Sequence, residues 1–137
     1  MKKFLLRMLT PERTFWDAEA VSVTVVDNEG ERQILAGHAP LVVALRPASV
    51  RIDDGEKTRV CASGEGFLTV EKDAVYLMCQ TFEWPEEIRD DRVNRAIQEH
   101  TEGLSRDGEK RRDYHEMTLE RARARLSVLA LQQRKNN

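Results

Sequence analysis

The sequence predicts an α+β chain, with an N-terminal all-β sandwich followed by a C-terminal antiparallel two-helix hairpin. Up to about residue 80, short apolar runs and turn residues alternate about every 8 to 12 residues, as in a sandwich or barrel. Beyond that point, apolar residues recur every three or four positions, as on one face of a helix. The 137 residues suffice for one ordinary domain with an appendage.

We expect residues 1–83 to form the β domain, whose strands follow from the side-chain pattern. Residues 21–25 alternate apolar and polar side chains, which a strand with one buried face requires. Arg7 interrupts the first apolar segment before it reaches the length of a signal peptide, so that segment is the expected first strand. Further strands are expected at residues 41–45, 48–52, 58–61, 67–70 and 74–79, with turns at 27–30, 53–55 and 71–73.

Residues 84–137 are predicted to form the helical hairpin. Pro85 and the carboxylates beside it suit the first turn of a helix, where proline is tolerated and the helix dipole favours negative charge. The glycines at 103 and 108 indicate a break between two helices. The first apolar stripe comprises Val93, Ala96, Ile97, His100 and Leu104, and the second comprises Tyr114, Met117, Leu119, Ala122, Leu126 and Leu129. Because the pair has little core of its own, it must pack against a partner.

The charge distribution favours a protein partner over nucleic acid or membrane. The net charge of −2 excludes a chain that is basic throughout. Residues 110–137 nevertheless carry eight Lys or Arg against three Asp or Glu, which predicts contact with an acidic partner. Aromatic residues are only 6% of the chain, too few to suggest a stacking platform for nucleic acid bases. No apolar stretch approaches the ~20 residues of a membrane helix.

The sequence shows no known catalytic motif, and the isolated candidates have simpler interpretations. His38 follows Gly37 in a forced turn and is a candidate general base, although a hydrogen bond within the turn or to a neighbouring subunit is favoured. Cys61 and Cys79 lie in apolar runs, which favours small buried hydrophobes in a reducing cytoplasm over a disulfide or a zinc site. His100 and His115 can face each other across the hairpin, but no metal is expected because further ligands are lacking.

Three arginines on the second predicted helix are the remaining candidates for binding. Arg121, Arg123 and Arg125 occupy alternate positions, which diverge by about 200° on a helix, so the three cannot form one flat patch. Arg121 and Arg125 share a face and can bind a phosphate or carboxylates through forked hydrogen bonds. The alternative is a solvated helix face whose charge is partly compensated by Asp113, Glu116 and Glu120.

A series of motifs in order along the chain resembles the epsilon subunit of bacterial F-type ATP synthase. The most specific is GHAPL at residues 37–41, and the similarity covers essentially the whole chain. The other matching segments are residues 10–15, 21–25, 29–31, 34–36, 44–47, 50–52 and 63–68. Glu65 is an extra residue between two glycines of the last segment and predicts a β-bulge.

The resemblance implies a non-catalytic subunit of the central rotor stalk, with the sandwich and hairpin described above. The implied partners are the gamma subunit, the c-subunit ring, and the alpha and beta subunits. The implied location is the cytoplasmic face of the bacterial plasma membrane, which the chain contacts only through the complex. The sandwich would couple ion-driven rotation of the ring to ATP synthesis, and the hairpin would inhibit ATP hydrolysis.

The resemblance also assigns contact roles to residues of this chain, but no catalytic residue and no metal. Glu29, Gly30 and Glu31 match the loop that faces the c-ring. His38, Ala39, Pro40 and Leu41 match the segment that packs near gamma and the ring. Arg121, Arg123 and Arg125 are the candidates for the inhibitory contact with alpha and beta.

Some members of the family bind ATP as a regulatory ligand through the pattern Ile/Leu-Asp-x-x-Arg-Ala. The matching stretch here, residues 88–93, reads IRDDRV and keeps only Ile88 and Arg92 of that pattern. No cofactor is therefore expected. A weak ATP site would comprise Ile88, Arg92, Arg121 and Arg125. The alternative function is a free-standing nucleotide-sensing module with a mobile hairpin.

Overall fold

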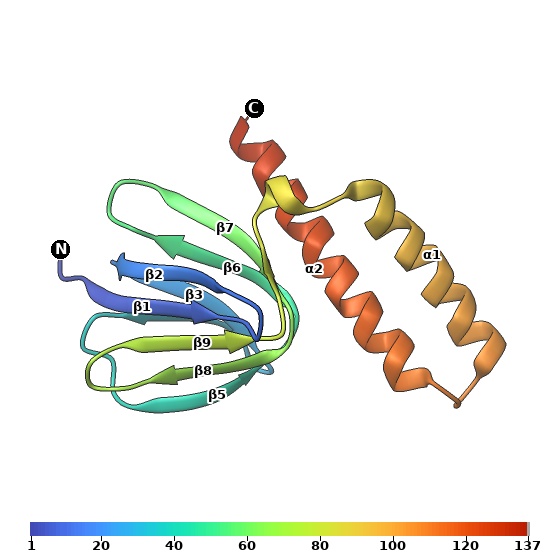
Figure 1. Ribbon diagram of the computed structural model, residues 1–137, viewed down its shortest axis with the longest axis horizontal. Coiled ribbons are helices and arrows are strands. Elements are labelled where there is room, and N and C mark those ends of the chain that lie inside the picture. The colour runs from blue at the N-terminus through green and yellow to red at the C-terminus, as the bar shows by residue number, and fades with distance from the viewer. Residues whose placement is uncertain (137) are drawn as a thin grey trace.

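The computed structural model describes residues 1–136, which form a two-sheet sandwich and a pair of helices packed at one end of it (Figure 1). The strands are β1 (Phe4–Leu9), β2 (Thr14–Ala20), β3 (Ser22–Asp27), β4 (Gly30–Leu35), β5 (Leu41–Leu45), β6 (Ala48–Asp53), β7 (Thr58–Ser63), β8 (Gly66–Val70), β9 (Val75–Cys79) and β10 (Phe82–Glu83). They are followed by a 3₁₀ turn, η1 (Pro85–Glu87), and by the helices α1 (Asp90–Asp107) and α2 (Arg112–Asn136). The α+β class predicted from the sequence is confirmed.

Each sheet has five strands, in the orders β2-β1-β9-β8-β5 and β10-β7-β6-β3-β4. Only β1 and β9 run parallel, and the other paired strands are antiparallel. Alternate side chains of both sheets point inward and form one core. Its largest fully buried members are Phe82, Leu6, Met8, Ile34, Ile52, Leu68 and Leu77. Since Phe82 belongs to this core, the sandwich extends to the short strand just before the helices.

The sandwich differs from the sequence prediction in its edge strands and in one bulge. The strands β2, β4 and β10 were not predicted. All three lie at an edge of their sheet, where β2 and β4 are mostly exposed or half-buried and β10 has only two residues. The bulge predicted at Glu65 is wrong: β7 and β8 keep regular register with their neighbours, and Glu65 lies in the crossover from one sheet to the other. The register irregularity instead lies between Met8 and Leu9.

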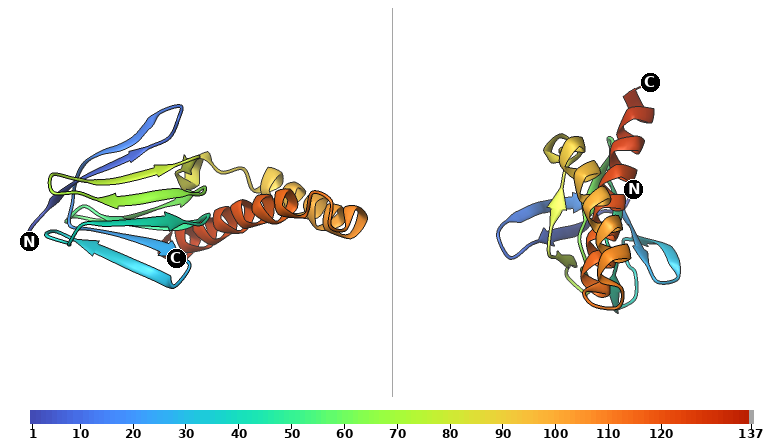
Figure 2. Two further views of the ribbon diagram at one scale, coloured as in Figure 1. Left: turned by 90° about the horizontal axis from the view of Figure 1, so that it is seen from below. Right: turned by 90° about the vertical axis from the view of Figure 1, so that its right-hand side faces the viewer.

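The predicted antiparallel helical hairpin is present, with α2 between α1 and the sandwich. Along its length α2 contacts β6, β7 and η1 on one side and α1 on the other. Figure 2 shows that the far end of the pair projects away from the sandwich. Leu119 and Ala122 of the predicted stripe are buried and Met117, Leu126 and Leu129 are half-buried, but α2 packs on two sides and its buried surface is wider than that stripe. Tyr114 was assigned to it and is 47% exposed, whereas Ala124 was not and is buried.

The break between the helices is shorter than predicted. The first helix continues through Gly103 and ends at Asp107, and Gly108 follows with a φ of +60°. A glycine fits inside this helix because the ring of His115 occupies the space where a Cβ would lie, as described below. Within the described residues, no helix is both long and apolar enough to cross a membrane.

The two cysteines are buried and unpaired, which confirms their interpretation as small core residues. Burial in the apolar core raises the pKa of both thiols, that of Cys79 to about 12. Both therefore stay protonated, and neither has the thiolate character of a reactive cysteine.

Candidate functional site

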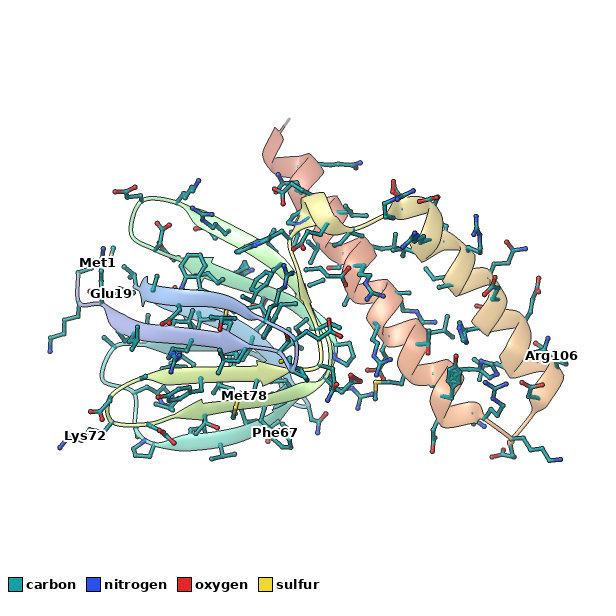
Figure 3. The ribbon with its side chains drawn as sticks, in the orientation of Figure 1. Met1, Glu19, Phe67, Lys72, Met78 and Arg106 are labelled. Carbon is teal, nitrogen blue, oxygen red and sulfur yellow. The ribbon has the colours of Figure 1, made fainter. Side chains whose placement is uncertain are left out.

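Two of the three predicted contact arginines bind the chain's own sandwich. Arg121 donates from Nη2 to both carboxylate oxygens of Glu65, at 2.7 and 2.8 Å, and Arg125 donates from Nε to Glu83 at 2.6 Å. In the opposite sense, Arg46 of the sandwich pairs with Glu120 of α2. Three ion pairs thus fix α2 on the sandwich. Figure 3 shows that side chains fill the space between the strands and α2.

Arg123 is separated from the other two arginines, as the helical spacing predicts. It is exposed, and within the described residues its guanidinium has no hydrogen-bond or ion-pair partner. Of the three predicted contact arginines, the docked hairpin therefore leaves Arg123 free and keeps Arg121 and Arg125 occupied. A partner that binds all three must first separate α2 from Glu65 and Glu83.

The apolar contact beneath the ion pairs is smaller than the sandwich core. Its buried members are Ala62, Ile88, Val93, Ala122 and Val128, and the partly buried Val60, Ile97, Leu126 and Leu129 pack against them. The buried members contribute less burial than the sandwich core, which contains Phe82 and several leucines. Partly exposed ion pairs are worth about 0–1 kcal/mol each, and bidentate arginine pairs are at the upper end. The contact that docks α2 thus combines three ion pairs with an apolar cluster that is smaller than the sandwich core.

The β3–β4 turn presents the predicted carboxylates on a rigid frame. Asp27 accepts a hydrogen bond from the Glu29 backbone N–H at 2.8 Å. It also forms an ion pair with Arg32, whose Nε donates to Asp27 Oδ2 at 2.8 Å. The Arg32 guanidinium and the backbone donor lower the pKa of Asp27. Gly30 adopts a φ of +117°, which an L side chain rarely tolerates. Glu29 and Glu31 are left exposed at this turn.

The segment containing His38 follows the end of β4 that lies opposite the β3–β4 turn, so the structure does not place it beside that turn. Gly37 turns the chain with a φ of +81°. The His38 ring donates from Nδ1 to the Ala39 carbonyl at 2.7 Å. This hydrogen bond within the turn is the favoured interpretation of His38 given above. The exposed residues His38, Ala39 and Pro40 line an open depression together with Lys3 and Lys72.

The sheet that contains β5, β8 and β9 carries an exposed apolar patch that the sequence analysis did not predict. Val42 on β5, Phe67 on β8 and Met78 on β9 are 69, 54 and 48% exposed. Phe67 pairs directly with Met78 across the strands, and Figure 3 shows both on the same face. The signal in the sequence was the unbroken apolar run 41–45, which gives β5 apolar side chains on both faces. Such a patch marks a protein contact surface.

Comparison with known proteins decides the family. The family described as "ATP synthase, Delta/Epsilon chain, beta-sandwich domain" matches residues 3–85. The chain is 36% identical to the ATP synthase epsilon chain of Natranaerobius thermophilus, over 96% of this chain and 95% of that one. The chain belongs to the ATP synthase epsilon chain family. The epsilon chain of Ruminiclostridium cellulolyticum is 37% identical and covers 93% of this chain and 96% of its own length.

Solved structures support the epsilon-chain fold. A chain of the Euglena gracilis mitochondrial ATP synthase superimposes with a TM-score of 0.82 at 23% identity, covering 93% of this chain and 81% of the other. A chain from the central stalk and c-ring of the Tetrahymena thermophila mitochondrial enzyme gives a TM-score of 0.57 at 16% identity, covering 66 and 73%. The family match and the two epsilon-chain relatives confirm the resemblance found in the sequence motifs. An epsilon chain is a non-catalytic subunit of the synthase.

The four residues of the possible ATP site of this epsilon chain are only partly brought together. Arg92 and Arg125 line one shallow depression together with Arg89, and Glu83 and Glu87 line it too. Arg125 is already paired with Glu83 there. Ile88 is buried in the cluster beneath α2, and Arg121 is held by Glu65. Within the described residues, no three side chains of His, Cys, Asp or Glu are grouped so as to hold a metal ion.

Proposed function

We propose that this epsilon chain is a rotor subunit of a bacterial F-type ATP synthase that couples c-ring rotation to ATP synthesis and restrains ATP hydrolysis through its hairpin. The observation that carries the inhibitory part is the docking of α2 by Arg121 and Arg125, the same side chains that would bind alpha and beta. The complex would stand at the cytoplasmic face of the plasma membrane. The chain would touch the membrane only through its partners.

The sandwich offers two separate surfaces for the rotor partners. The apolar patch of Val42, Phe67 and Met78 suits a stable contact with the gamma subunit, because burying it removes apolar area from water. The exposed carboxylates of Glu29 and Glu31 suit polar loops of the c-ring. The segment 38–41, at the other end of β4, would provide a further contact near gamma and the ring.

The hairpin has the properties of a two-state element. Docked, it has Arg121 and Arg125 neutralised by Glu65 and Glu83. Released, it would present both arginines and Arg123 to acidic segments of alpha and beta. A difference of a few kcal/mol between two docking sites is enough for partners to shift the population.

The test is to assemble the enzyme with the full-length chain or with a chain truncated after Arg89, and to measure gamma co-purification and ATP hydrolysis. The truncation point must preserve Phe82, which is 2% exposed and stacks on Phe15 at 5.2 Å. We expect truncation to raise hydrolysis and to leave assembly intact. Unchanged hydrolysis would contradict the inhibitory role, and a full-length chain that fails to bind gamma would contradict the rotor role.

A further inference from the structure

Two histidines join the helices at the far end of the hairpin, away from the sandwich. The Nδ1 atoms of His100 on α1 and His115 on α2 lie 2.8 Å apart. The other ring nitrogen of His115, Nε2, lies 2.9 Å from Asp107 Oδ2. His115 is only 3% exposed, and a Cβ at Gly103 would lie 2.4 Å from its Cε1 atom, so the helix packs directly on the ring.

The hydrogen-bond network fixes where the protons are. Arg106 and His115 lower the pKa of Asp107 to about 2, so its carboxylate is ionised and can only accept. His115 must therefore donate from Nε2. When the ring of His115 is neutral, its Nδ1 carries no proton and accepts the hydrogen bond that His100 donates from its own Nδ1.

We propose that His100 and His115 form a proton-operated latch, which holds the hairpin tip closed until both imidazoles are protonated. A first extra proton can enter at His100 Nε2 without disturbing the Nδ1–Nδ1 bond. A second must enter at His115 Nδ1. Two N–H donors and two positive charges then face each other, and the hydrogen bond between the helices is lost.

The charged groups around His100 and His115 do not change the number of protons that the closed tip can accept. The recess is lined by Glu99, Glu102 and Arg106 of α1, by Arg111 of the turn between the helices, and by Tyr114 of α2. The two carboxylates and the two guanidinium groups thus surround the pair with charges of both signs. The Arg111 guanidinium lies over the Tyr114 ring at 4.7 Å, and that ring contacts both imidazoles. None of the residues that line this recess comes from the sandwich.

The direction of the pH effect follows from the number of protons that each state binds. The closed tip accepts one extra proton, whereas the open tip accepts two. Histidine side chains ordinarily change charge between about pH 5 and 8, so the open form gains stability as the pH falls through this range. One additional proton changes the equilibrium by a factor of about ten per pH unit. The latch controls the contact between α1 and α2 at the tip, and it leaves the ion pairs of Arg121 and Arg125 with the sandwich unchanged.

The test is NMR of the full chain between about pH 7.5 and 5, reading imidazole ¹⁵N shifts and amide exchange in residues 100–115. At neutral pH we expect protons on His115 Nε2 and His100 Nδ1. Below about pH 6, amide protection at the tip should fall about tenfold per pH unit, after correction for intrinsic exchange. The proposal is overturned if both imidazoles of the unmodified protein become fully protonated while amide protection at the tip stays unchanged.

A histidine variant distinguishes opening of the latch from acid-induced loss of amide protection that has other causes. His100→Gln keeps an N–H donor for His115 Nδ1 but cannot titrate, and its amide can turn to accept from a protonated His115. This variant should keep tip protection nearly constant over the same pH range. His38→Gln removes the remaining histidine, at an exposed turn far from the tip, and should behave as the unmodified chain. Equal acid-induced loss of protection in His100→Gln would refute the latch.

Discussion

The guanidinium of Arg121 on α2 binds both carboxylate oxygens of Glu65, which lies in the crossover between the two sheets. The two residues are 56 positions apart in the chain, and their contact is the most specific link between hairpin and sandwich. Glu65 therefore competes with any outside partner for this arginine. Its carboxylate helps to set how often the hairpin is released.

Replacing Glu65 with Gln should release the hairpin more often. The substitution removes the charge that holds Arg121, and a loss of about 1 kcal/mol raises the undocked population about fivefold. Amide exchange in the middle of α2 should rise by that factor, and raised salt should reduce the difference by screening the ion pairs. The matched control is Glu71→Gln, in an exposed turn at the other end of the sandwich. Equal protection in both variants would show that Glu65 does not govern docking.

The sequence was sufficient for the strands that alternate and for the existence of the hairpin, because these depend on local patterns. It did not reveal β2, whose edge position leaves most side chains in water. It also did not show how α2 docks, since neither the register of a helix on a sheet nor a pair such as Arg121 and Glu65 has a local signal. The apolar patch was missed because the sequence does not distinguish the exposed Phe67 from its buried neighbour Leu68 when both belong to the same apolar run.

Replacing Gly103 with Ala should destabilise the hairpin, although alanine is the better helix former. The gain in helix propensity is about 1 kcal/mol, whereas overpacking costs about 1–3 kcal/mol. Here the new Cβ would lie 2.4 Å from His115 Cε1, so the ring must move and its hydrogen bonds to His100 and Asp107 weaken. Urea unfolding followed by circular dichroism should show a net loss of about 1–2 kcal/mol.

The control for this substitution is Ser105→Ala on the exposed side of the same helix. It gains helix propensity without a clash, so its stability should stay equal or rise slightly. A Gly103→Ala variant that is as stable as Ser105→Ala would contradict the close packing of His115 on α1.

Replacing Phe67 with Ser should weaken binding to gamma and leave the stability of the isolated chain nearly unchanged. Phe67 is 54% exposed at the centre of the apolar patch, so folding buries only part of its ring while a partner would bury the rest. We expect affinity for gamma to fall about tenfold, which corresponds to about 1.4 kcal/mol. The control is Leu35→Ser, which removes a side chain that is 51% exposed on the opposite sheet. Similar losses in both variants would argue against the patch as the gamma surface.

Glu87 should make the segment between sandwich and helices sensitive to acid. Its carboxylate accepts hydrogen bonds from Arg13 at 2.9 Å and from the Trp84 backbone N–H at 3.0 Å. The hydrogen bond from Arg13 lowers the pKa of Glu87 below its usual value of 4.5. A group whose pKa is lowered by folding stabilises the native state above its unfolded pKa, and this contribution disappears as the pH falls through the folded value.

We therefore expect Glu87→Gln to be less stable than the unmodified chain at neutral pH, by no more than about 1 kcal/mol because the pair is partly exposed. The difference should shrink below about pH 4 as the native carboxylate takes up its proton. Urea unfolding at several pH values measures both curves, and Glu86→Gln removes a neighbouring exposed carboxylate as the control. The difference in unfolding free energy between the unmodified chain and Glu87→Gln should therefore depend on pH. If it stays constant down to about pH 2, the charge of Glu87 contributes no stability through its hydrogen bond with Arg13.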